Sequence, residues 1–161
     1  MPLHRLLYRS EITLPGSETA VRHQIDAIVA ESEARNAAAE LTGALLYVRG
    51  LIVQVLEGPL PAIEATFERI CCDLRHRRVE LLELTQAEGR MFGSWSMTHI
   101  RVGHDLDALL PTRLIEIGAD GASAHATINL MRSLLTAGAA RAASQAEGEA
   151  AATARASLSR P

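Results

Sequence analysis

Between residues 3 and 102, short β-prone apolar runs take turns with segments in which apolar residues recur every three or four positions. This pattern predicts a series of strands and helices. Short β-prone runs predict five strands, at residues 3–9, 41–48, 51–56, 79–85 and 95–102. Apolar residues at three- and four-residue spacing predict two helices, one from Ser17 to about Asn36 and one from Pro61 to about Asp73. The predicted order is therefore β-α-β-β-α-β-β.

The clearest local signal is Arg49-Gly50, which separates two apolar runs and predicts a tight hairpin. Both runs are apolar on both faces, which is typical of strands that are covered on two sides. A hairpin between two helical crossovers matches an α+β fold with the ferredoxin-like layout, in which one sheet carries both helices on the same face. We expect this domain to span residues 1–102, with Gly58-Pro59 ending the third strand.

The pattern changes beyond the fifth predicted strand. We expect residues 103–140 to form a helical extension, with short turns at residues 105–110 and 112–117 and then a longer helix over residues 124–140. The apolar face of that longer helix consists of Ile128, Met131, Leu134 and Leu135. The tail, residues 141–161, is rich in Ala, Ser and Glu with little to bury, so frayed helix and disorder both remain open.

Composition narrows the classes of partner. The 161 residues suffice for one domain with an extension, and a net charge of -3 is too balanced for nucleic-acid binding. The adjacent Cys71 and Cys72 cannot join distant segments, which fits a reducing compartment. No apolar run approaches the roughly 18 residues of a membrane span, so we expect a cytoplasmic protein that contacts neither membrane nor nucleic acid.

Polar residues interrupt two apolar patterns. The stripe of the first helix, through Ile25 and Ile28, continues onto Ser32 and Asn36, which either finish the helix or present hydrogen-bonding groups to a ligand. Gln54 stands inside an apolar strand, where an amide without partners costs about 1–3 kcal/mol. A cross-strand partner would satisfy it, and Tyr8 on the neighbouring first strand is the candidate that also suits a ligand site.

Two further clusters have an ordinary and a functional interpretation. The end of the second helix carries the polar residues Asp73, Arg75 and His76. They either are simply solvated and compensate the helix dipole, or bind an anionic or polyol ligand. Trp95 and Met97 are expected on one face of the fifth strand, either as core residues or as a packing element with two states.

Together these segments resemble the BLUF family (blue light using flavin) over nearly all of residues 3–102. Each motif alone is weak, but their order is specific. The motifs that carry the resemblance are Leu7-Tyr8-Arg9-Ser10, Asn36 followed by Leu41-Thr42-Gly43-Ala44-Leu45-Leu46-Tyr47, Gln54-Val55-Leu56-Glu57-Gly58, Asp73-Leu74-Arg75-His76 and Arg90-Met91-Phe92-Gly93-Ser94-Trp95-Ser96-Met97.

The resemblance implies a flavin, usually FAD, held between the two helices, although the sequence does not distinguish FAD from FMN or riboflavin. It implies that Asn36 and Ser32 lie at the flavin ring, and that Asp73, Arg75 and His76 hold the other end of the cofactor. It also implies that Tyr8 donates an electron and a proton to the excited flavin. Gln54 then rotates or tautomerises, which changes the hydrogen bonds at the ring.

By the same resemblance, Trp95 and Met97 exchange packing and pass the change to the C-terminal helices. No cyclase, phosphodiesterase, kinase or DNA-binding segment fits the residues after Val102. We therefore expect a short stand-alone photoreceptor without enzymatic turnover. Its output would need an unidentified partner protein, or a homodimer or higher homo-oligomer.

Two other functions fit the same layout. An acylphosphatase-like hydrolase would need a loop that cradles an anion after the first strand, but Glu11 follows Arg9-Ser10 there and no glycine-rich loop is present. An interaction module that has lost its flavin is the second alternative. Purified protein would then be colourless rather than yellow.

Overall fold

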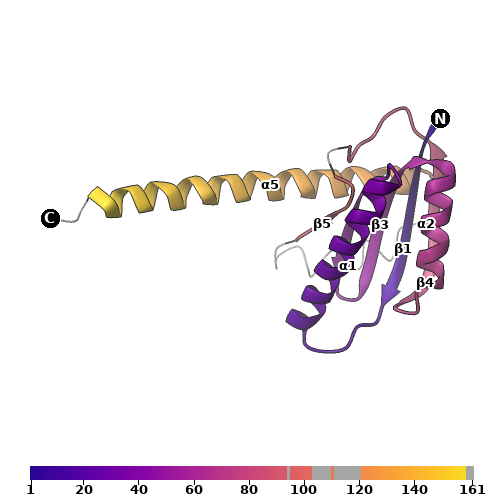
Figure 1. Cartoon of the computed structure of the whole chain (residues 1–161), viewed down its shortest axis with the longest axis horizontal. Helices are drawn as coiled ribbons and strands as arrows, with labels where there is room; N and C mark the ends of the chain where they lie inside the picture. The colour runs from indigo at the N-terminus through magenta and orange to yellow at the C-terminus, as the bar shows by residue number, and fades with distance from the viewer. Residues whose placement is uncertain (94, 103–109, 111–120, 159–161) are drawn as a thin grey trace.

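The computed structural model describes the whole chain except residues 94, 103–109, 111–120 and 159–161. One five-stranded sheet, in the order β4-β1-β3-β2-β5, forms the centre of the domain (Figure 1). The elements are β1 (Leu3–Ile12), α1 (Glu18–Ala38), β2 (Thr42–Val48), β3 (Leu51–Pro59), α2 (Leu60–Cys72), β4 (His76–Gln86), β5 (Thr98–Ile100) and α5 (Gly121–Leu158). The expected α+β ferredoxin-like layout is confirmed.

Strand pairing places the two central polar residues opposite each other. β1 lies antiparallel between β3 and β4, and Tyr8 on β1 is in register with Gln54 on β3. β2 and β3 form the predicted hairpin, and its turn residues Arg49 and Gly50 have φ values of 47° and 87°. Positive φ at both positions is the geometry of the tight turns that suit twisted strands, and glycine adopts it without strain.

The helix boundaries follow from local chemistry. The Ser17 hydroxyl accepts a hydrogen bond from the Ala20 amide at 3.3 Å and caps α1, as the sequence indicates. Pro61 lies in the first turn of α2, where its missing amide hydrogen is tolerated. β3 ends at Pro59, in the dipeptide expected to stop it, but the strand continues three residues beyond the predicted Leu56 and pairs there with the start of β1.

The sheet has a separate apolar core on each face. On one face α1 and α2 cover the strands, in a cluster that includes Leu6, Tyr8, Ile25, Val29, Leu56 and Ile63. On the other face α5 covers them, in a cluster that includes Leu7, Leu46, Val55, Phe92, Ile128 and Met131. Side chains that alternate along each strand therefore serve two different layers.

The fifth strand is shorter than predicted. Only Thr98–Ile100 forms β5, which pairs in parallel with β2. The expectation that Trp95 and Met97 both stand on this strand was therefore wrong. The backbone before β5 bonds elsewhere, since the carbonyl oxygen of Trp95 accepts from the Gly43 amide at 3.0 Å and that of Ser96 accepts from the Asn36 side chain at 2.9 Å.

The C-terminal helix is longer than predicted. α5 runs without interruption from Gly121 to Leu158, and its second half projects beyond the domain (Figure 1). Its first half packs on the sheet through the expected Ile128 and Met131, whereas residues 141–150 are all exposed. Among the described residues, no helix is both long and apolar enough to cross a bilayer. The turns expected at residues 105–110 and 112–117 lie outside the described residues, apart from the buried Leu110.

Candidate functional site

A cleft of about 110 Å³ lies between α1 and α2, and its floor is the centre of the sheet. Seven predicted site residues line it: Tyr8, Ser32, Asn36, Gln54, Asp73, Arg75 and His76. They come from β1, β3, α1, the connection between α2 and β4, and the start of β4, so residues far apart in the sequence meet at one place. The fold therefore gathers the predicted residues around a single opening.

The floor of the cleft holds a buried pair of polar side chains. The Tyr8 hydroxyl donates a short hydrogen bond to the Gln54 carbonyl oxygen Oε1. At the other end of the same amide, Nε2 faces the Met97 sulfur at 3.6 Å. A thioether is a weak acceptor, so one end of the Gln54 amide is bonded strongly and the other weakly. The cross-strand partner that the buried amide required is therefore Tyr8.

The surroundings of Tyr8 keep its phenol protonated. Burial raises its pKa far above the ordinary value, and the nearby Cys71 and Asp73 raise it further. The ring of Phe67 lies 5.5 Å from that of Tyr8, centroid to centroid, and covers one side of it. Tyr8 is thus an uncharged hydrogen-bond donor at neutral pH, because its anion would be buried beside negative groups.

Asn36 and Ser32 lie on α1 above the cleft. Asn36 is buried although it is only two residues from the end of α1, and its side-chain nitrogen holds the Ser96 carbonyl. The helix cap is Ala39, so the Asn36 side chain serves the site and the loop before β5 rather than capping the helix. Ser32 is half-buried and lines the cleft one turn earlier.

The other end of the cleft carries charge. Arg75 contacts the Asp73 carboxylate with Nε at 2.9 Å, and this bond is the main cause of an Asp73 pKa of about 2. Burial lowers the pKa of His76 despite the opposing effect of Asp73, so its ring is neutral near pH 7. Its Nδ1 lies 2.8 Å from the Ser10 hydroxyl. Arg75 and His76 are thereby held in fixed positions beside the opening.

Trp95 and Met97 are separated in the structure. Met97 is buried against the Gln54 amide, whereas Trp95 is 37% exposed and does not line the cleft. Of the two, only Met97 contacts the polar pair. The sequence could not make this distinction, because it depends on where the fifth strand begins.

The sequence analysis missed several residues at the cleft. Thr66 and Arg69 line it from α2, and Glu31 and Arg35 line it from α1. The signal was available: Arg35 is four residues from Glu31 and Arg69 three from Thr66, and each arginine bonds to that helical neighbour. The rim of the cleft therefore carries Arg35 and Arg69 in addition to the predicted Arg75, and Arg35 and Arg75 are each paired with a carboxylate.

These residues fit a flavin nucleotide. A flat ring system needs apolar walls and a few hydrogen-bonding groups, and the cleft offers Ile28, Leu45 and Ile70 beside the amides of Asn36 and Gln54. A phosphate group needs cations, and the rim carries Arg35, Arg69 and Arg75. The chemistry of the lining thus matches both halves of the cofactor.

Comparisons with known proteins agree with this site. The BLUF family model, described as sensors of blue-light using FAD, matches residues 3–98. A photoactivated adenylate cyclase subunit beta of Euglena gracilis is 38% identical over 97 residues, which is 60% of this chain and 11% of that protein. The chain thus spans about a tenth of the length of that relative.

Two further relatives are of different size. The blue light- and temperature-regulated antirepressor BluF of Escherichia coli is 33% identical over 95 residues, or 59% of this chain and 23% of that protein. The solved dark-state structure of BlrB, a BLUF protein, has a TM-score of 0.67 and 29% identity, and the match covers 85% of this chain and 97% of that chain. The likeness to BlrB therefore extends beyond the residues that the family model covers.

Proposed function

The chain belongs to the BLUF family of blue-light sensors that use FAD, and from this premise we propose that its Tyr8–Gln54 pair is a light-driven hydrogen-bond switch. The observation that carries the proposal is the buried contact between a phenol and an amide at the floor of the cleft. A bound flavin supplies the absorption of blue light and, in its excited state, an acceptor for an electron. Everything else is done by side chains of this protein.

Tyr8 is suited to give up an electron and a proton together. Its raised pKa means that it does not ionise in the dark, so the proton leaves only when the phenol is oxidised. The Gln54 oxygen already accepts the phenol hydrogen and gives that proton a first acceptor. Reversal of the transfer restores the phenol, so no net chemistry is performed.

Gln54 is suited to store the result. Its amide has a donor end, Nε2, and an acceptor end, Oε1. In the structure Oε1 accepts from the Tyr8 hydroxyl; after the amide turns over, Nε2 would donate to that hydroxyl instead. Since the Met97 thioether is the only acceptor for Nε2 among the described residues, little is lost on that side when the amide turns. Two arrangements of similar energy are what a bistable switch needs.

The remaining cleft residues would hold the cofactor. Asn36 and Ser32 would hold the flavin ring, and Arg75, His76 and their neighbours at the rim of the cleft would hold the phosphate-bearing chain. The Asp73–Arg75 pair keeps that guanidinium in place. This arrangement suits FAD and would also suit FMN, because the arginines of the rim would bind a phosphate group of either.

The output would pass from Met97 to the other face of the sheet. Met97 immediately precedes β5, whose Ile100 lies in the same apolar cluster as Ile128 and Met131 of α5. A shift at Met97 can thus reach α5 through a short path of packed residues. We propose that the projecting half of α5 carries the response to a partner protein or to a second copy in a homodimer, without an enzymatic step in this domain.

A light-minus-dark absorption spectrum tests the switch. Wild-type protein with bound flavin is expected to show a small red shift of the blue band under illumination that reverses in darkness. Tyr8→Phe removes the donor and Gln54→Leu removes the amide, so both variants should bind flavin and lose the shift. A normal red shift in either variant would overturn the assignment, and colourless wild-type protein would favour the interaction module.

A further inference from the structure

The loop between β4 and β5 reaches the photoactive pair but has little regular structure of its own. Its described residues, 87–93 and 95–97, contain no helix or strand. Even so, it places the Ser96 carbonyl on Asn36 and the Met97 sulfur on Gln54. Something outside the loop must therefore fix its position.

Glu57 is the central anchor. This carboxylate is fully buried on β3, three residues beyond Gln54, and accepts hydrogen bonds from the loop amides of Met91 at 2.8 Å and Phe92 at 3.0 Å. The side chains of Arg5 and Thr42 also donate to it, at 2.9 and 3.1 Å. A buried carboxylate with four donors is both satisfied and held rigidly.

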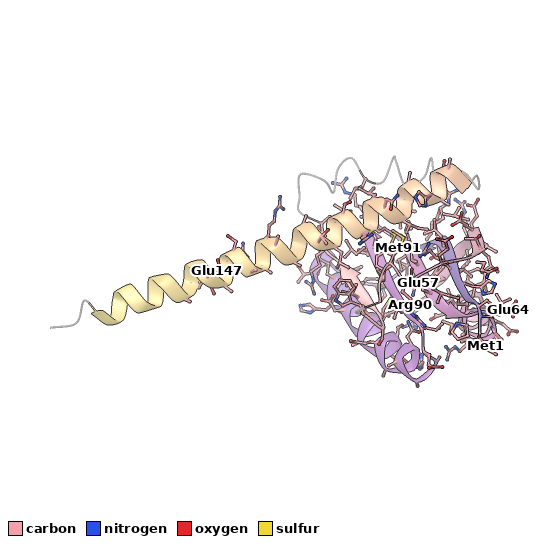
Figure 2. The ribbon with its side chains drawn as sticks, turned by 90° about the horizontal axis from the view of Figure 1, so that it is seen from above. Met1, Glu57, Glu64, Arg90, Met91 and Glu147 are labelled. Carbon is pink, nitrogen blue, oxygen red and sulfur yellow. The ribbon has the colours of Figure 1, made fainter. Side chains whose placement is uncertain are left out.

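Two arginines complete the attachment. Arg90 donates to the hydroxyl of Thr42 at 2.8 Å and to the backbone carbonyls of Glu57 at 2.8 Å and Glu40 at 2.7 Å. Arg5, from β1, also holds the Gly89 carbonyl at 2.8 Å. Figure 2 shows Glu57, Arg90 and Met91 close together within the domain. The start of the loop is thus bonded to all three central strands.

The anchored residues face both layers of the molecule. Phe92, whose amide Glu57 holds, is fully buried in the cluster that contains Ile128 and Met131 of α5. The Trp95 amide in turn donates to the Phe92 carbonyl at 3.0 Å, and Met97 follows two residues later. Glu57 therefore lies at the junction between the switch and α5.

We propose that Glu57 is a positioning residue of the photocycle: it holds the loop so that Met97, rather than Trp95, lies against Gln54, and it thereby favours the dark arrangement. The proposal rests on the proposed function of the Tyr8–Gln54 pair. Glu57 touches neither Tyr8 nor Gln54, so its effect passes through the loop. Weakening this anchor should change the return from the lit state without preventing flavin binding.

Glu57→Gln tests this role, because the amide keeps the shape of the side chain but loses its charge and half of its acceptor capacity. We expect flavin to remain bound and the red shift to form, with dark recovery slowed about tenfold as the dark arrangement loses charge-assisted bonds. Trp95 is the only tryptophan, so its fluorescence reports on the loop directly. Its acrylamide quenching constant should rise about twofold as the loop loosens.

The matched control is Glu11→Gln, which removes a half-buried carboxylate that pairs with Arg78 on the same sheet. Recovery and quenching in Glu57→Gln that equal those of this control would overturn the proposal. If Glu57→Gln does not fold, Arg90→Gln takes its place as the test. It removes the bonds of the loop to Thr42 and to the carbonyls of Glu57 and Glu40, so it should also slow dark recovery and raise the quenching constant. Absence of a red shift in the wild-type protein would contradict the proposed Tyr8–Gln54 switch. Acrylamide quenching does not require a photocycle, so it would still test whether Glu57 holds the loop.

Discussion

The two faces of the central sheet are built from the same strands but hold different kinds of residue. Under α1 and α2 the strands present the polar pair Tyr8 and Gln54, whereas the cluster around Val55 under α5 is apolar, with the carboxylate of Glu57 buried two residues further along β3. Gln54 and Val55 are neighbours in sequence and both are buried, so burial alone does not explain their difference. One face is shaped to meet a polar ligand and the other to meet a helix.

The difference shows which interactions serve function and which serve stability. Apolar contacts under α5 bury surface from water and need no partner of a particular chemistry. The polar pair under the cleft can be exchanged for hydrocarbon without loss only if both members change together, because a single change leaves the other unsatisfied. Substitutions on the two faces should therefore change the free energy of unfolding by different amounts.

The largest expected difference is between an amide added to the α5 face and an amide removed from the cleft. Val55→Gln buries an amide without a partner in a filled core, so we expect a loss of about 4 kcal/mol in the free energy of unfolding. The double variant Tyr8→Phe with Gln54→Leu replaces both partners by apolar groups and should stay within about 1 kcal/mol of wild type. Urea unfolding of the flavin-free proteins measures both, and equal losses would contradict the comparison.

A second difference separates the two halves of α5. Met131 is fully buried, so Met131→Ala should cost about 3 kcal/mol. Removing residues 141–161 should cost less than about 0.5 kcal/mol, because residues 141–150 bury nothing within the domain. The same urea experiment applies. A large loss on truncation would show that the projecting half of α5, which carries Glu147 in Figure 2, packs on something in solution.

Local signals in the sequence were sufficient for much of the fold. The Arg49-Gly50 turn and the Ser17 cap each depend on neighbouring residues, and both are confirmed. The facing of Tyr8 and Gln54 could also be predicted, because the layout fixes which strands are adjacent.

The errors concern interactions between distant segments. The residues before β5 are kept out of the strand by bonds to Gly43 and Asn36, which no local pattern records. Glu57 in an apolar run was a visible signal of a buried acid, but the sequence does not reveal that Arg5 and the loop amides satisfy it. The length of α5 was missed because its second half lacks an apolar face.

The smallest expected effect is a dependence of stability on pH that belongs to the cleft face. Burial lowers the pKa of His76 and also that of His99, where the Asp26 carboxylate opposes it from 2.8 Å. A histidine whose folded pKa is depressed binds a proton more readily when unfolded, so its contribution is complete above about pH 6.5 and decreases as the pH falls below that value. The pKa values of Asp26 and Asp73 are lowered as well, so both stay ionised in this range.

Between pH 7.5 and 5.5 we therefore expect the free energy of unfolding to fall by about 1 kcal/mol at fixed flavin concentration. His76→Gln and His99→Gln should each remove part of that slope. His125→Gln, on the exposed surface of α5, is the matched control and should leave it unchanged. A slope that survives both cleft-face variants but disappears in His125→Gln would contradict the assignment of this pH dependence to His76 and His99.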